Sequence, residues 1–92
     1  MNKESDLTIL REEIKKVTAE IIRLAGERLS LAKKIGEIKY QQNLPIRDLK
    51  VERELKRLVL EKCQTYKIDY NFGLKLLNLL IDEAIKEEKR EF

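Results

Sequence analysis

The 92-residue sequence has no histidine and only one cysteine, Cys63. Neither the usual zinc sites nor the common nucleophile–base pairs can be assembled from such a set. A lone cysteine also excludes a disulfide framework, which makes an intracellular, cytoplasmic location the expectation. The sequence carries no cofactor-binding motif either. We therefore expect a protein that works with no metal ion and no cofactor.

Long apolar runs and a strong charge imbalance are also missing. No apolar stretch approaches the length that crosses a membrane, and the charged N-terminal segment argues against a secretory signal. The net charge is only +3, with acidic and basic residues interspersed. A general nucleic-acid binder usually carries a larger, clustered basic excess. We expect neither a membrane nor a nucleic acid as partner.

The sequence is instead rich in helix-forming patterns. Hydrophobic residues make up 42% of it and charged residues 40%, with three glycines, a balance that favours helices joined by short turns. Its length suits one small domain spanning residues 1–92.

Apolar positions recur at alternating steps of three and four, the pattern of a long helix with one buried seam. The seam positions are Leu7, Leu10, Ile14, Val17, Ile21, Leu24, Arg28, Leu31, Ile35 and Ile38. Arg28 is the one charged member, and burying a guanidinium is unfavourable unless a polar or anionic group meets it. Two interpretations stay open: Arg28 reaches solvent or fixes the register, or the seam opens around it to hold an anion.

Helix boundaries follow from caps and breakers. Ser5 or Asp6 can cap the first helix, which ends before Pro45. The seam keeps its phase across Gly26 and Gly36, so we expect one uninterrupted helix of about 35 residues, roughly 50 Å long.

Two shorter helices follow. Asp48 is the expected cap or first-turn acid of the second, which ends near Tyr66. Asp69 or Asn71 caps the third, which carries apolar residues from Phe72 onward and dissolves into the charged tail at 86–91.

The predicted fold class is therefore all-α, with one long and two shorter helices. The shorter helices could flank the long one only by packing end to end along it. Much of the seam would then stay exposed, and a second copy of the chain is the simplest cover. We predict an intertwined homodimer.

Helical spacing brings two cations together. Lys39 lies eleven positions after Arg28 and within roughly 20° of the same helix face, so both can converge on one dianionic small molecule. Arg11 lies seventeen positions before Arg28, about 25 Å away along the axis. If Arg11 takes part, it must come from a partner chain.

Three acids lie at the ends of apolar helix faces, each with a purely structural alternative. Asp48 can simply cap its helix, and Glu52 can pair with Lys56 one turn on. Glu88 follows Ala84 on an apolar face but sits in a charged segment, where it could be solvated.

The combined pattern is similar to that of the all-helical, AroQ-class chorismate mutases. The residues that carry the resemblance are Leu10-Arg11, Ala25-Gly26-Glu27-Arg28, Leu31-Ala32, Lys39, Pro45-Ile46-Arg47-Asp48 and Glu52. The resemblance implies the rearrangement of chorismate to prephenate on the route to phenylalanine and tyrosine. It also implies an intertwined homodimer with two shared active sites.

The resemblance assigns roles position by position. Arg11 would reach the site of the other subunit, Arg28 would bind a substrate carboxylate, and Lys39 would contact a carboxylate and the ether oxygen. Asp48 would contribute through the start of its helix, and Glu52 would accept a hydrogen bond from the ring hydroxyl.

The sequence departs from the family pattern at three positions of the expected site. Val51 stands where a basic residue is common, Ala84 where a serine or threonine is, and Glu88 where a glutamine is. Because an ionised Glu88 would repel charge developing on the ether oxygen, it can assist only when protonated. An ordinary glutamate is ionised at neutral pH, so we expect turnover to be highest at mildly acidic pH.

Two other functions fit parts of the sequence. An isochorismate pyruvate-lyase shares the fold and the type of ligand. A non-catalytic dimerisation module needs only the heptad pattern, but it leaves Arg28 in the seam without an explanation.

Overall fold

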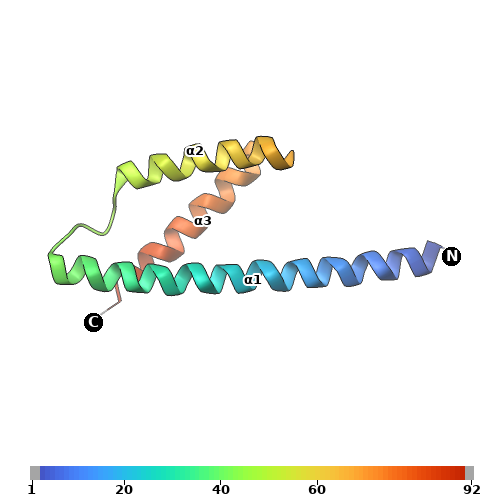
Figure 1. Ribbon diagram of the computed structural model, residues 1–92, viewed down its shortest axis with the longest axis horizontal. Coiled ribbons are helices and arrows are strands. Elements are labelled where there is room, and N and C mark those ends of the chain that lie inside the picture. Colours follow the sequence, from blue (N-terminus) through green and yellow to red (C-terminus); the bar gives the residue numbers. More distant parts are fainter. Residues whose placement is uncertain (1–2, 91–92) are drawn as a thin grey trace.

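The computed structural model describes residues 3–90, and that part of the chain contains three helices and no strand. Helix α1 spans Lys3–Gln42, α2 spans Leu49–Tyr66 and α3 spans Tyr70–Glu88 (Figure 1). The all-α prediction with one long and two shorter helices is confirmed. Residues 1, 2, 91 and 92 of the predicted domain lie outside the described part.

Helix α1 is 40 residues long and runs without a break through Gly26 and Gly36, as expected. It begins earlier than predicted, however, so Ser5 and Asp6 lie inside it and are not its caps. At 1.5 Å per residue such a helix is about 60 Å long, which matches the 61 Å longest dimension of the molecule. No helix in the described part is long and apolar enough to cross a membrane.

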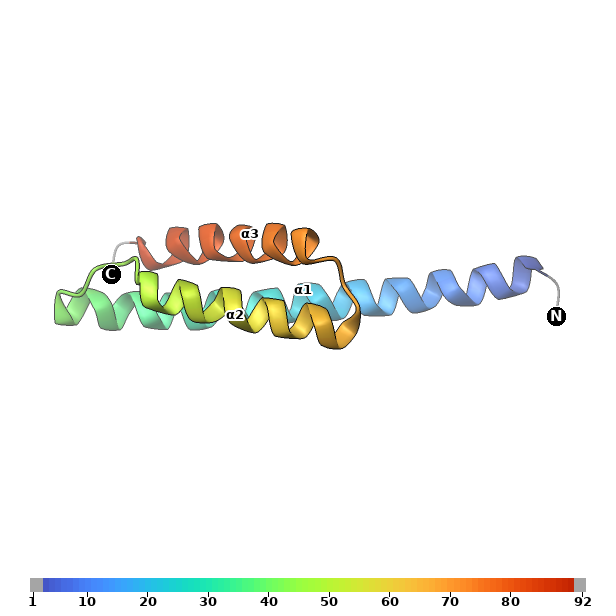
Figure 2. The ribbon, with the colours of Figure 1, turned by 90° about the horizontal axis from the view of Figure 1, so that it is seen from above.

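The two shorter helices do not pack end to end along α1, so that prediction is wrong. They form a hairpin that folds back over the C-terminal half of α1, with α3 in contact with both other helices (Figures 1 and 2). The reason is the short turn after Tyr66, where Lys67 adopts a left-handed conformation and its N–H donates to the Cys63 carbonyl. This helix end reverses the chain within three residues.

Both shorter helices begin at an aspartate. The Asp48 side chain accepts from the backbone N–H groups of Lys50 and Val51, and the Asp69 side chain accepts from that of Phe72. The cap predicted at Asp48 is confirmed, and of the two candidates for α3 it is Asp69 that serves. Helix α3 extends to Glu88, three residues into the segment expected to be a dissolving tail.

Helix α1 packs against α3 through small residues. Ala32 is only 4% exposed and Gly36 is buried, whereas the neighbouring seam residues Leu31 and Ile35 remain about half exposed. A Cβ on Gly36 would lie 2.7 Å from the Cα of Glu88, so glycine is what allows the two backbones this approach. Of the predicted seam, Arg28 reaches α3, but these large apolar residues are not covered by it.

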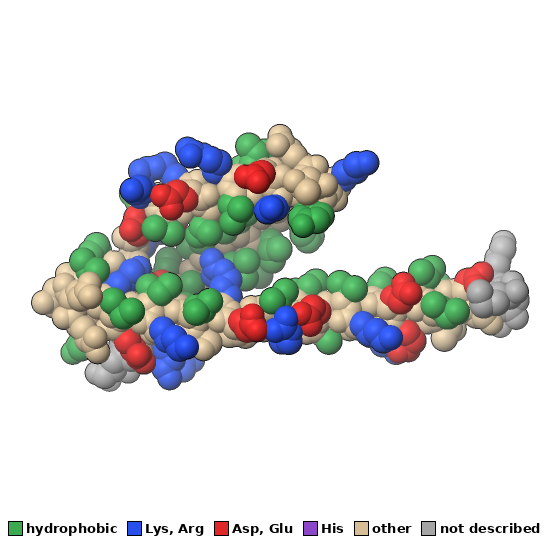
Figure 3. Space-filling view, in the orientation of Figure 1, with side chains coloured by type: hydrophobic (Ala, Val, Ile, Leu, Met, Phe, Trp, Pro, Cys, Tyr) green, Lys and Arg blue, Asp and Glu red, His purple; other side chains and the backbone are tan. Residues whose placement is uncertain are grey.

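The N-terminal half of α1 extends beyond the hairpin, and no other described part of the chain covers it (Figures 2 and 3). Its apolar stripe remains open to solvent, with exposed fractions from 45% at Leu7 to 66% at Ile14. On α3, Leu77 and Ile81 are buried, but Leu76 and Leu79 are exposed. Large apolar areas of this kind mark interaction surfaces.

Candidate active site

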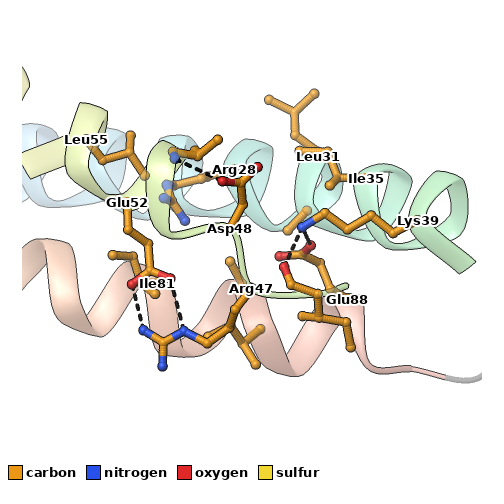
Figure 4. A pocket seen from close by; sticks show the side chains of 15 residues that line it. Arg28, Leu31, Ile35, Lys39, Arg47, Asp48, Glu52, Leu55, Ile81 and Glu88 are labelled. Carbon is orange, nitrogen blue, oxygen red and sulfur yellow. Dashed lines mark hydrogen bonds and ion pairs between the residues drawn. The ribbon is translucent and has the colours of Figure 1, made fainter. Parts of the chain in front are cut away.

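A pocket of about 380 Å³ opens where the three helices and the loop at 43–48 meet (Figure 4). Its apolar walls include Leu31 and Ile35 from α1, Leu55 from α2, and Ile81 and Ile85 from α3. The predicted site residues that line it are Arg28, Lys39, Asp48, Glu52, Ala84 and Glu88. Six of the seven predicted site residues therefore line one pocket of a single chain.

Lys39 and Glu88 form a partly buried ion pair on one side of the pocket. The Lys39 Nζ donates to Glu88 Oε1 at 2.5 Å, and the two side chains are only 19% and 10% exposed. The same ammonium group donates to the backbone carbonyl of Ile46. Glu88 is therefore not a solvated residue of a charged tail, which was the structural alternative.

Arg28 lines the pocket and makes a hydrogen bond to α3. Its Nη1 donates to the backbone carbonyl of Leu80 at 2.9 Å. A guanidinium has five N–H donors, so this contact fixes its direction and leaves donors for an anion. Arg28 thus has a specific polar partner on the helix opposite, within the described chain.

Glu52 does not pair with Lys56 as the structural alternative had it. It accepts two hydrogen bonds from Arg47, from Nε to Oε2 at 3.0 Å and from Nη2 to Oε1 at 2.6 Å. The hydrogen-bonded Arg47 guanidinium holds the pKa of the Glu52 carboxyl below its usual range, and Lys56 adds a smaller effect in the same direction. Glu52 is therefore an ionised acceptor at the pocket wall.

The remaining predicted residues are placed as follows. Asp48 lines the pocket and also caps α2. Ala84 and Val51 also line it, and neither offers a side-chain donor. Arg11 lies on the exposed N-terminal half of α1 and is not among the residues that line the pocket of its own chain.

Arg47 is the polar residue of the pocket to which the sequence pattern assigned no role. It lies in the loop between α1 and α2, where helical periodicity predicts nothing. The available signal was its spacing of five from Glu52 across the helix cap, with opposite charges on the two residues.

The charges that line the pocket balance. Arg28, Lys39 and Arg47 are opposed by Asp48, Glu52 and Glu88. Such a site can orient a polar ligand between apolar walls, and its fixed donors can stabilise charge that develops on a bound oxygen. Among residues 3–90, no group of three or more His, Cys, Asp or Glu side chains is placed to hold a metal ion.

The chain was compared with known proteins. Residues 10–89 match the family described as chorismate mutase type II. A chorismate mutase of Methanocaldococcus jannaschii is 34% identical over 76 residues, which is 83% of this chain and 77% of that protein.

Bifunctional relatives match as well. A chorismate mutase/prephenate dehydratase of Aquifex aeolicus is 52% identical over 50 residues, or 54% of this chain and 14% of that protein. The enzyme of the same description from Escherichia coli is 28% identical over 85 residues, 92% of this chain and 22% of that protein. The chain thus spans less than a quarter of these two enzymes. The resemblance inferred from the spaced cations is confirmed, and the chain belongs to the chorismate mutase type II family.

Proposed function

We propose that the protein is a chorismate mutase that converts chorismate to prephenate. The observation that carries the proposal is the convergence of Arg28 and Lys39 on one apolar-walled pocket, beside Glu88, in a chain of this family. Both cations are held by protein acceptors, the Leu80 carbonyl for Arg28 and the Ile46 carbonyl with Glu88 for Lys39. Donors fixed in this way need little reorganisation when charge develops in the transition state.

The reaction suits a site without a nucleophile. The rearrangement is unimolecular, so that no proton has to move and no covalent intermediate forms. Catalysis then consists of holding the folded conformer and stabilising negative charge on the ether oxygen as the C–O bond breaks. The apolar walls at Leu55 and Ile81 confine the ring, while Lys39 provides the positive charge at the ether oxygen.

Each remaining site residue has a role in this proposal. Arg28 binds a carboxylate through its planar donor pair. Glu52 accepts a hydrogen bond from the ring hydroxyl, and Asp48 contributes through the start of α2. Ala84 contacts the substrate without donating, and Glu88 donates to the ether oxygen when it is protonated.

The balanced charge of the pocket supports a shared site. Chorismate is a dianion, and two of the three cations that line the pocket, Lys39 and Arg47, already pair with Glu88 and Glu52. A further cation from outside the chain would supply a second charge for the substrate. We propose that the protein is an intertwined homodimer and that Arg11 of one subunit completes the pocket of the other.

The test is an ultraviolet assay that follows chorismate and, separately, isochorismate with the purified protein. We expect the first to be converted to prephenate, and Arg28→Ala to lower kcat/KM by about a thousandfold, since it removes a charged contact to the substrate. Release of pyruvate from isochorismate alone would identify a lyase instead. No turnover of either compound would leave only the dimerisation module.

A further inference from the structure

Arg47 and Glu52 form the most regular ion pair at the pocket. Two N–H groups of one guanidinium meet the two oxygens of one carboxylate, at 3.0 and 2.6 Å (Figure 4). This two-point geometry fixes the orientation of a carboxylate as well as its charge. A single contact would leave the Glu52 carboxylate free to rotate.

The two partners differ in burial, which separates this pair from ordinary surface ion pairs. Glu52 is only 16% exposed, while Arg47 is 60% exposed. An exposed pair contributes little to stability, because water screens it and both side chains lose rotamer freedom. We therefore expect this pair to matter for the orientation of the half-buried Glu52 carboxylate and not for the stability of the fold.

Glu52 remains able to bind a ligand while Arg47 holds it. A carboxylate has about four lone-pair sites, and Arg47 occupies one on each oxygen. The others remain for a hydroxyl donor in the pocket that both residues line. The Glu52 carboxylate raises the pKa of Arg47, and the negative charge of Asp82 on α3 adds the smallest effect in the same direction. A residue of the loop thus orients an acceptor that belongs to α2.

We propose that Arg47 is a positioning residue that acts through Glu52 and selects substrates with a hydroxyl on the ring. This inference rests on the proposed function, since the hydroxyl belongs to chorismate. Arg47 would then determine substrate specificity from the loop between α1 and α2, and not from a helix. In this proposal Arg47 binds a carboxylate of the protein and not one of the substrate. It therefore does not replace the basic residue that is common in the family at the position of Val51.

The test compares two substrates, chorismate and the analogue that lacks its ring hydroxyl. For chorismate, Arg47→Gln should lower kcat/KM by about tenfold, the usual effect of losing a charge-assisted hydrogen bond. For the analogue, wild type and Arg47→Gln should be equal, because Glu52 then has no donor to meet. An equal loss on both substrates would mean that Arg47 only supports the fold or binds a carboxylate, and it would overturn the inference.

A double-variant cycle gives an independent readout. If Arg47 acts through Glu52, then Arg47→Gln combined with Glu52→Gln should be no slower than Glu52→Gln alone. If the losses in kcat/KM of the two single variants multiply in the double variant, the inference is overturned. Arg47→Lys keeps the charge but not the two-point geometry, so it should remain close to Arg47→Gln. Full recovery with lysine would show that charge alone matters, which also overturns it.

Arg23→Gln is the matched control. Arg23 also makes multiple hydrogen bonds to glutamates, to Glu20 and Glu27, but it lies on the exposed face of α1 and does not line the pocket. It should turn over both substrates as the wild type does. A wild type inert toward chorismate would overturn the proposed function and this inference with it. An active wild type with an unaffected Arg47→Gln would overturn the inference alone.

Discussion

At the scale of single residues, the main feature is that the proposed catalytic lysine already has an acid as partner. Lys39 donates to Glu88 and to the Ile46 carbonyl, which fixes its ammonium group at the pocket wall. The ionised form of Glu88, however, cancels the charge that a substrate anion would meet there. Protonation would remove that cancellation and turn an acceptor into a donor. Glu88 should therefore control both binding and the chemical step.

Glu88→Gln should change the dependence of turnover on pH. A carboxylate at position 88 cannot donate to the ether oxygen, whereas a glutamine donates at every pH, so Glu88→Gln should have the higher kcat/KM on the alkaline side. Glutamine is a permanent neutral donor, so the variant should stay active there and its profile should be flat. The measurement is kcat and kcat/KM for chorismate across the pH range.

Glu83→Gln is the control for this experiment. Glu83 pairs with Lys86 on the same helix and does not line the pocket, so its variant should keep the wild-type profile. Superimposable profiles for the wild type and Glu88→Gln would rule out a protonated Glu88 at the reacting atoms.

The sequence predicted those residues whose placement depends on helical phase. Arg28 and Lys39 share a face of α1 because eleven residues make about three turns, and Glu52 and Glu88 each end an apolar row on their own helix. Phase does not extend into loops, so it could not place Arg47. It could not reveal the Lys39–Glu88 pair either, because that contact depends on how α3 crosses α1.

At the scale of helices, the site depends on how closely α3 approaches α1. Gly36 lies against the backbone of Glu88, and Ala32 lies one turn earlier on the same face. The absence of a side chain at Gly36 is therefore what brings Glu88 within reach of Lys39. The sequence pattern predicted burial of the large apolar residues of α1, whereas the small ones make the contact with α3.

The two glycines inside α1 should respond to alanine in opposite ways. Gly36→Ala places a methyl group on the Glu88 backbone, so it should destabilise the fold by about 2 kcal/mol and lower kcat by at least about tenfold through displacement of Glu88. At Gly26 a Cβ meets nothing within 4 Å. Gly26→Ala should stabilise the helix by about 1 kcal/mol and leave turnover unchanged. Thermal unfolding and the chorismate assay measure both, and equal behaviour of the two variants would contradict the close approach.

At the scale of the whole molecule, a single copy of the chain does not cover its own apolar surface. Half of α1 has no partner within the described chain, and two of the three cations that line the pocket already pair with acids of the same chain. A second copy placed with its α1 antiparallel would cover the stripe and deliver Arg11 at the same time. The sequence pattern indicated the uncovered seam, but the prediction of where α2 and α3 lie was wrong. An amphipathic pattern shows which face of a helix is apolar, and it does not show where two helices cross.

A mixture of two inactive variants should regain activity if the site is shared. Arg11→Ala and Arg28→Ala should each be nearly inactive alone. After co-refolding in equal amounts, half the dimers are mixed and each holds one intact site, which predicts about a quarter of wild-type activity. Sedimentation should report twice 10.9 kDa for each protein. A mixture as inactive as its parents would place Arg11 outside the partner's site.

The uncovered half of α1 also has a consequence for the kinetics of folding. A helix segment without tertiary contacts is only marginally stable in water, because packing supplies most of the stability of helices in proteins. The amides of residues 7–24 should therefore exchange with solvent until two chains have met, while those of the α2–α3 hairpin are protected earlier. Refolding should then contain a second-order phase, whose half-time halves when the chain concentration doubles. Pulse-labelled hydrogen exchange during refolding would show protection of the N-terminal half appearing in that phase.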